Sequence, residues 1–383
     1  MPEAARRLLV AGVTARPLAV SAARAGWAVA AADAFGDLDL RACADVLPPR
    51  ASGGFDPTET AAAMRGLPVD AVAYTSNFEN HPAAVSALAR GRRLLGNPPA
   101  VLRRVRDPLE LMRALRRLGF ETPATLAAPP RSPGADRPRW LLKPRRSGGG
   151  HGTTAWRAGR PVARHQYLQE RISGPPGSIA FLADGRGSLA LALSRQLVGR
   201  RAFGAAGFRY CGSLMGSGLF PAEEALRRRA EALAGAVVRA FGLVGLNGID
   251  FIARAGVPWP IEVNPRFSAS MELLERGAGL PLFTLHAAAC DGRLPDAPPP
   301  PLLAVHGKAV VFARDDARTG ETRGWLDDPA LADIPHPNQR IARGRPICTV
   351  FASGPDLRTC LRGLEARAAW VYRQLRPAVR GAA

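Results

Sequence analysis

Two acidic residues in a short apolar region are the residues of this chain best placed to do chemistry. Residues 245–267 read GLNGIDFIARAGVPWPIEVNPRF, and apolar residues alternate with polar ones on both sides of Gly256. This alternation predicts a β-hairpin. If the hairpin closes symmetrically about Gly256, Asp250 lies directly opposite Glu262. The opposite face is then apolar, through the pairs Ile249–Val263 and Phe251–Ile261.

The opposed acids predict a bound cation, because two carboxylates at directly opposed positions repel each other. Asn264 lies two residues beyond Glu262, on the same face of its strand. Two carboxylates and an amide oxygen form an all-oxygen ligand set, which suits Mg²⁺ and leaves room for phosphate oxygens. Arg266 follows as a fork-shaped donor directed at the same place. The alternative is a solvated hairpin face whose acids never meet a metal.

A lysine followed by a glycine loop is the second candidate element. The segment WLLKPRRSGGGHGT predicts a strand that ends at Lys143 and a loop over residues 147–152. Consecutive glycines let backbone N–H groups converge on a phosphate, and a nearby ammonium neutralises it. The alternative is a flexible linker. Lys143 favours the phosphate site, because only it and Lys308 are lysines among 52 basic residues, and a compact ammonium retained there suggests a need for one.

Length and composition are those of a soluble globular protein. The 383 residues are enough for two or three domains, and 47% are hydrophobic. No apolar run approaches the ~18 residues of a membrane span. The N-terminal MPEAARRLLVAGV has too short an apolar run for a signal peptide, so we expect none. Five scattered cysteines without a Cys-x-x-Cys pair favour the cytoplasm and disfavour a zinc site.

The net charge of +20 is unusual, but it does not point to one basic face. The arginines are spread over the whole chain, and only 6% of residues are aromatic. Nucleic acid is therefore a disfavoured partner. A positive surface also attracts ATP and acidic small molecules, which is the interpretation we favour.

Short apolar strands alternate with Ala-rich helices between residues 7 and 98. This order predicts a parallel sheet with helices on both faces. The first turn, AGVTARP, lacks the glycines of a dinucleotide-binding loop, so Asp33 after the second strand is expected at the surface or facing a substrate. Three polar residues follow a later strand at the carboxyl edge of the sheet, where such folds bind ligands, and they are weak substrate-site candidates: Glu79, Asn80 and His81.

The remaining chain predicts a second region of mixed helices and antiparallel strands. Asp107 and Pro108 mark a helix start, with Glu110 reaching back to cap it. The Pro-rich residues 129–139 are the expected seam between subdomains. Further expected elements are strands over residues 167–174, 178–185 and 189–197, helices over 221–241, 271–290 and 355–375, and a helix break at 279–281.

A lysine strand, a glycine loop, a Gln-Glu-x-Ile strand, and then Asp followed by Glu-x-Asn-Pro-Arg resemble the ATP-grasp superfamily in their order. The resemblance covers residues 5–350. The segments GKAVVFA and DIPHPNQRIARGRPICTVFASG are similar to the end of the carbamoyl-phosphate-synthetase and biotin-carboxylase-like branch. The chain also resembles ATP-grasp ligases of one-carbon cofactor pathways, such as the tyramine–glutamate ligase of methanofuran synthesis.

The resemblance implies an α/β fold in which an N-terminal Rossmann-like parallel sheet precedes two α+β subdomains that enclose ATP. The implied divisions are an N-terminal domain at 1–98, a subdomain with the glycine lid at 99–173, a subdomain with the metal strands at 174–300, and C-terminal strands with a closing helix at 301–383.

The resemblance also implies a role for each candidate residue, with ATP and Mg²⁺, or Mn²⁺ in its place, as cofactors. Asp250, Glu262 and Asn264 would hold the metal, while Lys143 and Arg266 would act on the transferred phosphoryl group. The implied ATP contacts are Lys143, the lid residues Ser147, Gly148, Gly149, Gly150 and Gly152, and the hinge residues Gln169, Glu170 and Ile172.

Two departures from the family pattern concern ATP. Many relatives carry a lysine directly after an Asp where this chain has Asp107-Pro108, so we assign Arg106 to the phosphates in its place. Relatives also often carry a ribose-binding Glu where this chain has GPPGS.

The implied activity is ADP-forming ligation of a carboxylate to an amine through an acyl phosphate, with an amino acid such as glutamate as a substrate. The expected partners are small molecules, and the expected assembly is a homodimer. A carboxylase that uses bicarbonate, and a non-catalytic nucleotide or nucleic-acid binder, are the alternatives.

Overall fold

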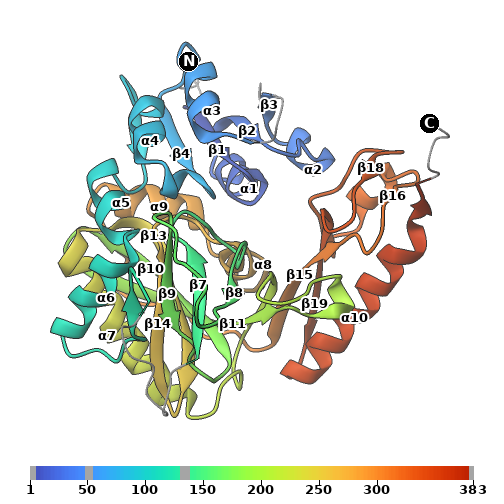
Figure 1. The fold of residues 1–383 in the computed structure, drawn as a ribbon. Coiled ribbons are helices and arrows are strands. Elements are labelled where there is room, and N and C mark those ends of the chain that lie inside the picture. The colour runs from blue at the N-terminus through green and yellow to red at the C-terminus, as the bar shows by residue number, and fades with distance from the viewer. Residues whose placement is uncertain (1–5, 48–54, 130–138, 379–383) are drawn as a thin grey trace.

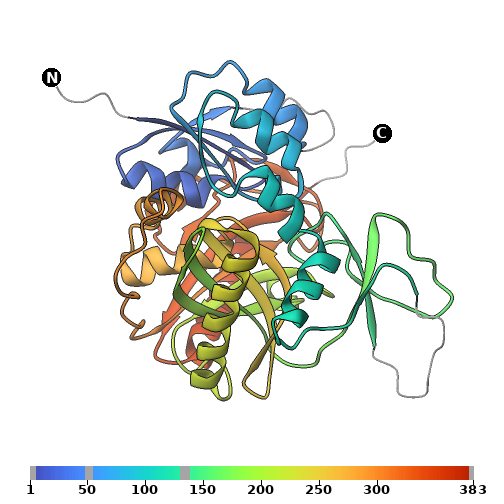
Figure 2. The same ribbon diagram turned by 90° about the vertical axis from the view of Figure 1, so that its left-hand side faces the viewer.

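The structure is a computed structural model, and it describes residues 6–47, 55–129 and 139–378. An N-terminal five-stranded parallel sheet, blue in Figure 1, lies above an eight-stranded antiparallel sheet. The four-stranded sheet that carries the glycine loop projects to one side in Figure 2. The expected mixed α/β fold is therefore confirmed.

The N-terminal sheet is parallel throughout, with strand order β3-β2-β1-β4-β5. The apolar residues of β1 are fully buried, which explains why this strand sits at the centre. The strands are β1 (Arg7–Gly12), β2 (Ala28–Asp33), β3 (Asp45–Leu47), β4 (Ala71–Tyr74) and β5 (Arg93–Leu95). The helices are α1 (Arg16–Arg24), α2 (Leu38–Arg41), α3 (Pro57–Ala63), the 3-10 turn η1 (Phe78–Asn80) and α4 (Pro82–Leu88).

Two helices, α5 (Pro99–Val105) and α6 (Pro108–Arg117), lead out of this sheet. The Asp107 carboxylate accepts hydrogen bonds from the backbone N–H groups of Leu109 and Glu110, so the predicted N-cap of α6 is present. The predicted return bond from Glu110 is wrong. Its carboxylate accepts a bond from Arg104 Nε at 2.9 Å, because a charged guanidinium is a stronger donor than a backbone N–H.

The second sheet is antiparallel, with the order β6-β9-β7-β8. Lys143 lies in β7 directly opposite Tyr167 in β9. The strands are β6 (Thr125–Leu126), β7 (Trp140–Pro144), β8 (Thr154–Ala155) and β9 (Gln166–Glu170). Most of the predicted seam, residues 130–138, lies outside the described residues.

The third sheet is antiparallel and has the order β14-β13-β10-β11-β12-β15-β19-β17. The C-terminal strands β15 and β19 continue the sheet that contains the predicted hairpin, so the division at residue 300 stays a prediction. The strands are β10 (Pro176–Asp184), β11 (Ser188–Val198), β12 (Tyr210–Met215), β13 (Val244–Arg254), β14 (Val257–Asn264), β15 (Val305–Phe312), β17 (Leu331–Ala332) and β19 (Pro346–Gly354).

Helices cover both faces of the third sheet. α7 (Glu223–Phe241) and α10 (Leu357–Gln374) contribute to one hydrophobic core, and α9 (Leu282–Cys290) contributes to another together with α1. The remaining elements are α8 (Glu272–Ala278), the 3-10 turns η2 (Arg201–Phe203), η3 (Ala269–Met271) and η4 (Arg323–Asp327), and the small sheet of β16 (Ala317–Arg318), β18 (Arg340–Ile341) and β20 (Arg376–Pro377). No helix within the described ranges has the length and apolar character needed to cross a bilayer.

A buried ion network joins the N-terminal sheet to the rest of the molecule. Arg16, at the start of α1, donates to both Glu272 oxygens and to both Asp333 oxygens, at 2.5–3.3 Å. Lys308 donates to the same Glu272 at 2.5 Å. Burial alone would raise the pKa of Glu272, but Arg16 and Lys308 outweigh it and hold the pKa far below its usual value.

We expect Arg16→Met to lower the free energy of unfolding by about 3–5 kcal/mol, because removing one partner leaves buried charges uncompensated. Arg24→Met, at an exposed position of the same helix, is the matched control and should change the free energy by less than about 0.5 kcal/mol. Urea unfolding followed by circular dichroism measures both. Equal losses in the two variants would contradict a structural role for the network.

Candidate active site

The predicted hairpin is formed by β13 and β14, and it brings the two acids together. Asp250 pairs directly with Glu262, and Ile249 pairs with Val263. The turn consists of Ala255 and Gly256, which have φ values of 50° and 71°. Two residues with positive φ form the mirror-image turn that suits a two-residue hairpin.

The predicted pairing of Phe251 with Ile261 is wrong. Phe251 pairs with Pro260, because a β-bulge between Asp250 and Phe251 shifts the register by one residue. β14 is the edge strand of its sheet and carries two prolines, Pro258 and Pro260, which cannot donate ladder hydrogen bonds. Because of this one-residue shift, a two-residue turn is compatible with a pairing in which Asp250 lies directly opposite Glu262.

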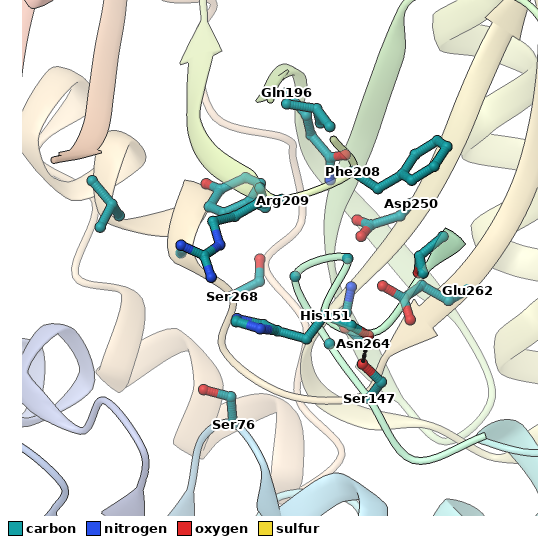
Figure 3. Close-up of a pocket in the computed structure, with 18 of the residues that line it drawn as sticks. Ser76, Ser147, His151, Gln196, Phe208, Arg209, Asp250, Glu262, Asn264 and Ser268 are labelled. Atoms are coloured by element: carbon teal, nitrogen blue, oxygen red, sulfur yellow. Dashed lines mark hydrogen bonds between the residues drawn. The ribbon is translucent and has the colours of Figure 1, made fainter. Parts of the chain in front are cut away.

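Asp250 and Glu262 begin a row of polar residues that crosses the sheet. Asp250 pairs with Ser178 in β10, and Ser178 pairs with Ser194 in β11. Burial, and then the Glu262 carboxylate, raise the pKa of Asp250 to about 7, although hydrogen bonds from Ser178, Gln196 and Asn264 oppose this. Figure 3 shows Asp250 and Glu262 side by side, with Asn264 close to them.

The chemistry of these donors fits Mg²⁺. No cluster of three or more His, Cys, Asp or Glu side chains suited to a metal occurs in the described part of the chain. A metal here would therefore take two carboxylates and the Asn264 amide oxygen from the protein, and its other ligands would be phosphate or water oxygens. Mg²⁺ prefers this shared coordination, since it is usually bound through one or two carboxylates together with substrate phosphates.

Three cations act on Glu262. Burial alone would raise the pKa of Glu262, but Arg106, Lys143 and Arg266 outweigh it and lower the pKa. Burial would likewise lower the pKa of Lys143, but Tyr167, Glu262 and Asp250 outweigh it and raise the pKa, so the ammonium stays charged. The site therefore consists of two paired carboxylates surrounded by fixed positive charges. Such charges stabilise a phosphoryl group during its transfer.

Arg106 connects three parts of the site. Its guanidinium donates to the Val263 carbonyl at 2.7 Å, to the Ser147 carbonyl at 2.9 Å and to Asn80 Oδ1 at 3.0 Å, and it lies 3.4 Å from Glu262. The hairpin, the glycine loop and the N-terminal sheet thus meet at one side chain. A second lysine is absent after Asp107, and Arg106 places a charge in the same cavity.

The glycine loop is folded down onto the segment before β12. The Tyr210 N–H donates to the Gly149 carbonyl at 2.9 Å, and Gly150 lies against the Phe208 carbonyl. The Ser147 hydroxyl donates to the His151 carbonyl at 2.6 Å, which closes the loop on itself. Burial and the charges of Arg209 and Arg345 lower the pKa of His151, so this histidine is neutral near pH 7.

We expect Gly150→Ala to weaken ATP binding at least about tenfold, because φ is +76° and a Cβ would lie 1.9 Å from the Phe208 carbonyl oxygen. Gly148→Ala is the matched control in the same loop, since its Cβ would meet no atom within 4 Å and its φ is ordinary. Fluorescence titration with a labelled ATP analogue compares them. Equal affinity losses would show that the docked loop does not contribute to nucleotide binding.

The predicted hinge residues line the same cavity, but two of their side chains are engaged. Gln169 is buried and accepts a hydrogen bond from Lys143 Nζ at 3.0 Å. The Glu170 carboxylate accepts one from the Ala124 N–H at 3.0 Å, which ties β9 to the residue before β6. Ile172 is a buried apolar residue of the wall. Contact of these three residues with adenine stays a prediction.

One cavity of about 1,370 Å³ is lined by thirteen of the fourteen predicted site residues, all except Gly152. The Cβ of a residue at position 152 would meet the Pro144 ring at 2.8 Å, so this glycine serves the packing of the loop on its own strand. The cavity also reaches the N-terminal sheet edge, at Thr75, Ser76, Asn77 and Glu79. It is large enough for a nucleotide and a second small molecule.

Arg266 points to the N-terminal sheet. Its Nε donates to Glu79 Oε1 at 2.8 Å, and the two side chains are 11% and 1% exposed. Glu79 Oε2 is buried and has no hydrogen-bond partner in the structure. The η1 turn thus contacts both arginines of the site, Arg266 through Glu79 and Arg106 through Asn80.

Comparison with known proteins identifies this arrangement. Residues 105–270 match the family model described as the ATP-grasp domain. Residues 105–270 are therefore an ATP-grasp domain. The match begins beside Arg106 and ends just after Arg266, so it includes the lysine strand, the glycine loop and the acidic hairpin.

Solved structures share the fold of this ATP-grasp protein at low sequence identity. The L-amino acid ligase from Bacillus licheniformis is 14% identical with a TM-score of 0.70, and the match covers 98% of each chain. The biotin carboxylase domain of Hydrogenobacter thermophilus 2-oxoglutarate carboxylase, solved with MgADP and bicarbonate, is 14% identical with a TM-score of 0.69, over 97% of this chain and 90% of that one. Rhizobium etli pyruvate carboxylase is 16% identical with a TM-score of 0.73, over 97% of this chain.

Two of the relatives are much longer than the part that matches. The match covers 37% of the pyruvate carboxylase chain. An uncharacterised protein of Methanocaldococcus jannaschii is 28% identical over 120 residues, which are 31% of this chain and 28% of that protein. These likenesses establish the ATP-grasp fold and leave the substrates open to proposal.

Several residues of the ATP-grasp site had no assigned role from sequence. Ser178 and Gln196 hydrogen-bond Asp250, and the Tyr167 ring lies 5.8 Å from Lys143 Nζ. Ser178 and Gln196 are polar residues in strands that are otherwise mostly apolar, which is a signal for a functional face. Their pairing with Asp250 depends on strand order, which the sequence does not specify.

Proposed function

We propose that this ATP-grasp protein is an ADP-forming ligase that joins a carboxylate to an amine through an acyl phosphate. The observation that carries the proposal is the directly paired Asp250 and Glu262, faced by Lys143, Arg106 and Arg266 in one cavity. A paired acid that faces several fixed cations is suited to a metal-bound triphosphate and to the charge that moves during phosphoryl transfer.

The residues have distinct roles in this proposal. Asp250, Glu262 and Asn264 would hold Mg²⁺, which would neutralise phosphate charge. Lys143 and Arg106 contact phosphate oxygens, and the docked glycine loop covers them and excludes water. The Gln169, Glu170 and Ile172 segment borders the adenine. Arg266, fixed by Glu79, stabilises the phosphoryl group or the acceptor carboxylate.

The reaction needs no protein nucleophile. The substrate carboxylate attacks the γ-phosphorus of ATP in line. The bond between the γ-phosphorus and the oxygen that bridges it to the β-phosphate breaks, and ADP leaves. The amine then attacks the acyl phosphate, and phosphate leaves as the C–N bond forms. The protein contributes position and charge, which account for most of the catalysis in phosphoryl transfer.

The narrower part of the proposal concerns substrates, location and assembly. We propose an amino acid such as glutamate as one substrate, within a one-carbon cofactor pathway of the methanofuran type. We also propose that the protein is a homodimer and that it is located in the cytoplasm. The five cysteines are consistent with a reducing compartment because all are free thiols. The alternative is a carboxylase, which the likeness to bicarbonate-bound and pyruvate carboxylases favours.

Trapping with hydroxylamine tests the ligase. Purified protein with Mg²⁺, ATP and a panel of carboxylic acids, including glutamate, should convert at least one acid to its hydroxamate with one ADP released per product. Glu231→Gln, at a partly exposed position on α7, is the control variant. ADP release that depends on bicarbonate, without hydroxamate from any acid, would replace the ligase with the carboxylase.

A further inference from the structure

Acidic residues gather around the part of the cavity that lies between the N-terminal sheet and the segment before β19, in a protein of charge +20. Four aspartates gather where the N-terminal sheet meets the segment before β19: Asp33, Asp37, Asp39 and Asp333. Arg16 of the buried network pairs with Asp333 and Asp39, while Lys308 donates to Glu272. The acids therefore outnumber the cations that pair with them.

Three of the four aspartates have protein partners for their oxygens. Asp33 accepts hydrogen bonds from three backbone N–H groups, those of Ala15, Phe35 and Gly36. Asp39 accepts from the N–H groups of residues 333 and 334, and it lies 3.4 Å from Arg16. Asp333 accepts from Arg16 and from the Thr349 hydroxyl.

Asp37 is different. Its side chain is 8% exposed and lines the cavity, yet it receives no hydrogen bond or ion pair from the described part of the chain. It precedes α2 in the N-cap position but does not cap the helix. Its oxygens are open to the cavity rather than sealed from it, so a ligand there can supply the donor that the protein does not.

The surroundings define what that ligand is. Phe35, Val13 and Pro335 line the same cavity, so the group that reaches Asp37 is accompanied by apolar surface. A metal ion is a poor fit, because the aspartates do not form a metal cluster among the described residues. An anion would meet repulsion from Asp33, Asp39 and Asp333.

We propose that Asp37 binds an ammonium group carried by an alkyl or aryl substrate of the ligase, and that this ammonium holds the substrate without taking part in the reaction, because a protonated nitrogen has no lone pair to attack the acyl phosphate. The role of the bound molecule as a substrate rests on the proposed function, but the binding site itself is defined by Asp37 and its cavity. It assigns the end of the substrate that carries this ammonium to the side of the cavity formed by the N-terminal sheet, and the reacting groups to the side of the metal hairpin.

The electrostatics of the free protein agree with this assignment. Burial, followed by the charges of Asp333, Asp33 and Asp39, raises the pKa of Asp37 well above its usual value, and Arg16 offsets this only in part. A bound ammonium would supply the positive charge that is missing, and charge-assisted hydrogen bonds of this kind are the strong ones.

Isothermal titration with matched probes tests the site. The probes are n-butylamine and benzylamine, which are cationic at pH 7.5, and their neutral counterparts 1-butanol and benzyl alcohol. We expect at least one amine to bind the wild-type protein at least tenfold more tightly than its alcohol. We expect Asp37→Asn, which keeps the side-chain shape, to lose that preference.

Asp45→Asn, at an exposed position on β3 of the same sheet, is the control and should keep the preference. Circular dichroism establishes that each variant is folded. No preference for the amines in the wild-type protein, including no binding at all, overturns the proposal, as does a preference that survives in Asp37→Asn. The titrations contain no nucleotide, so their outcome is independent of the hydroxamate assay that tests the ligase.

Discussion

Replacing Glu262 with Gln should lower ATP turnover by at least about 10²–10³-fold while the protein stays folded. The substitution removes one of the two carboxylates that would hold Mg²⁺. It also leaves Arg106, Lys143 and Arg266 facing a neutral amide. Coupled measurement of ADP release, titrated with Mg²⁺, should show both a slower maximum rate and a higher requirement for the metal.

Asp250→Asn is the companion variant, and it separates metal binding from folding. Burial and the Glu262 carboxylate raise the pKa of Asp250 to about 7, so the charge on this carboxyl contributes little to the stability of the free protein near neutral pH. We therefore expect thermal stability without metal to change little, while the stabilisation that Mg²⁺ and ATP give to the wild-type protein disappears. Retained turnover in either variant would rule out the hairpin as the metal site.

Arg266→Met should reduce kcat about 10²-fold, and Glu79→Gln about tenfold, with little change in the KM for ATP. Arg266 is held by Glu79 at 2.8 Å, and Glu79 belongs to the N-terminal sheet rather than to the matched domain. Weakening the anchor should misplace the guanidinium without affecting the nucleotide site. Steady-state kinetics of ADP formation measures both parameters.

The double variant decides whether Glu79 acts through Arg266. If Glu79 only positions the guanidinium, the Arg266→Met and Glu79→Gln changes together should cost no more than Arg266→Met alone, because the two residues act as one unit. Fully additive losses would show that Glu79 has a role of its own. Glu59→Gln, in the first turn of α3 and exposed, is the control for the loss of a surface acid from this sheet.

The chemistry of the site was the most predictable part of the molecule. The pairing of Asp250 with Glu262 follows from strand alternation, and the retention of Lys143 as a lysine indicated a constrained cation. Lys308, the other lysine, is also buried, at 2% exposed, and is bound to Glu272. Lys143 lines the cavity and donates to Gln169, so in both places a compact ammonium is held by a neighbouring side chain.

What the sequence could not indicate depends on contacts between distant segments. The bulge beside Asp250 depends on how an edge strand with two prolines meets its neighbour. The approach of Glu79 to Arg266 joins residues 187 positions apart, and the Arg16 network spans up to 317 positions. Local patterns carry no signal for such contacts. The periodicity of apolar residues predicts which face of a helix or strand is buried, but not which segment packs against that face.

A crystal structure with Mg²⁺ and a non-hydrolysable ATP analogue tests the central claim most directly. The account predicts a metal ion with one oxygen of Asp250 and one of Glu262 at about 2.0–2.1 Å, with the terminal phosphates between the hairpin and the glycine loop. A nucleotide bound elsewhere, or a metal ion held without either acid, would contradict it.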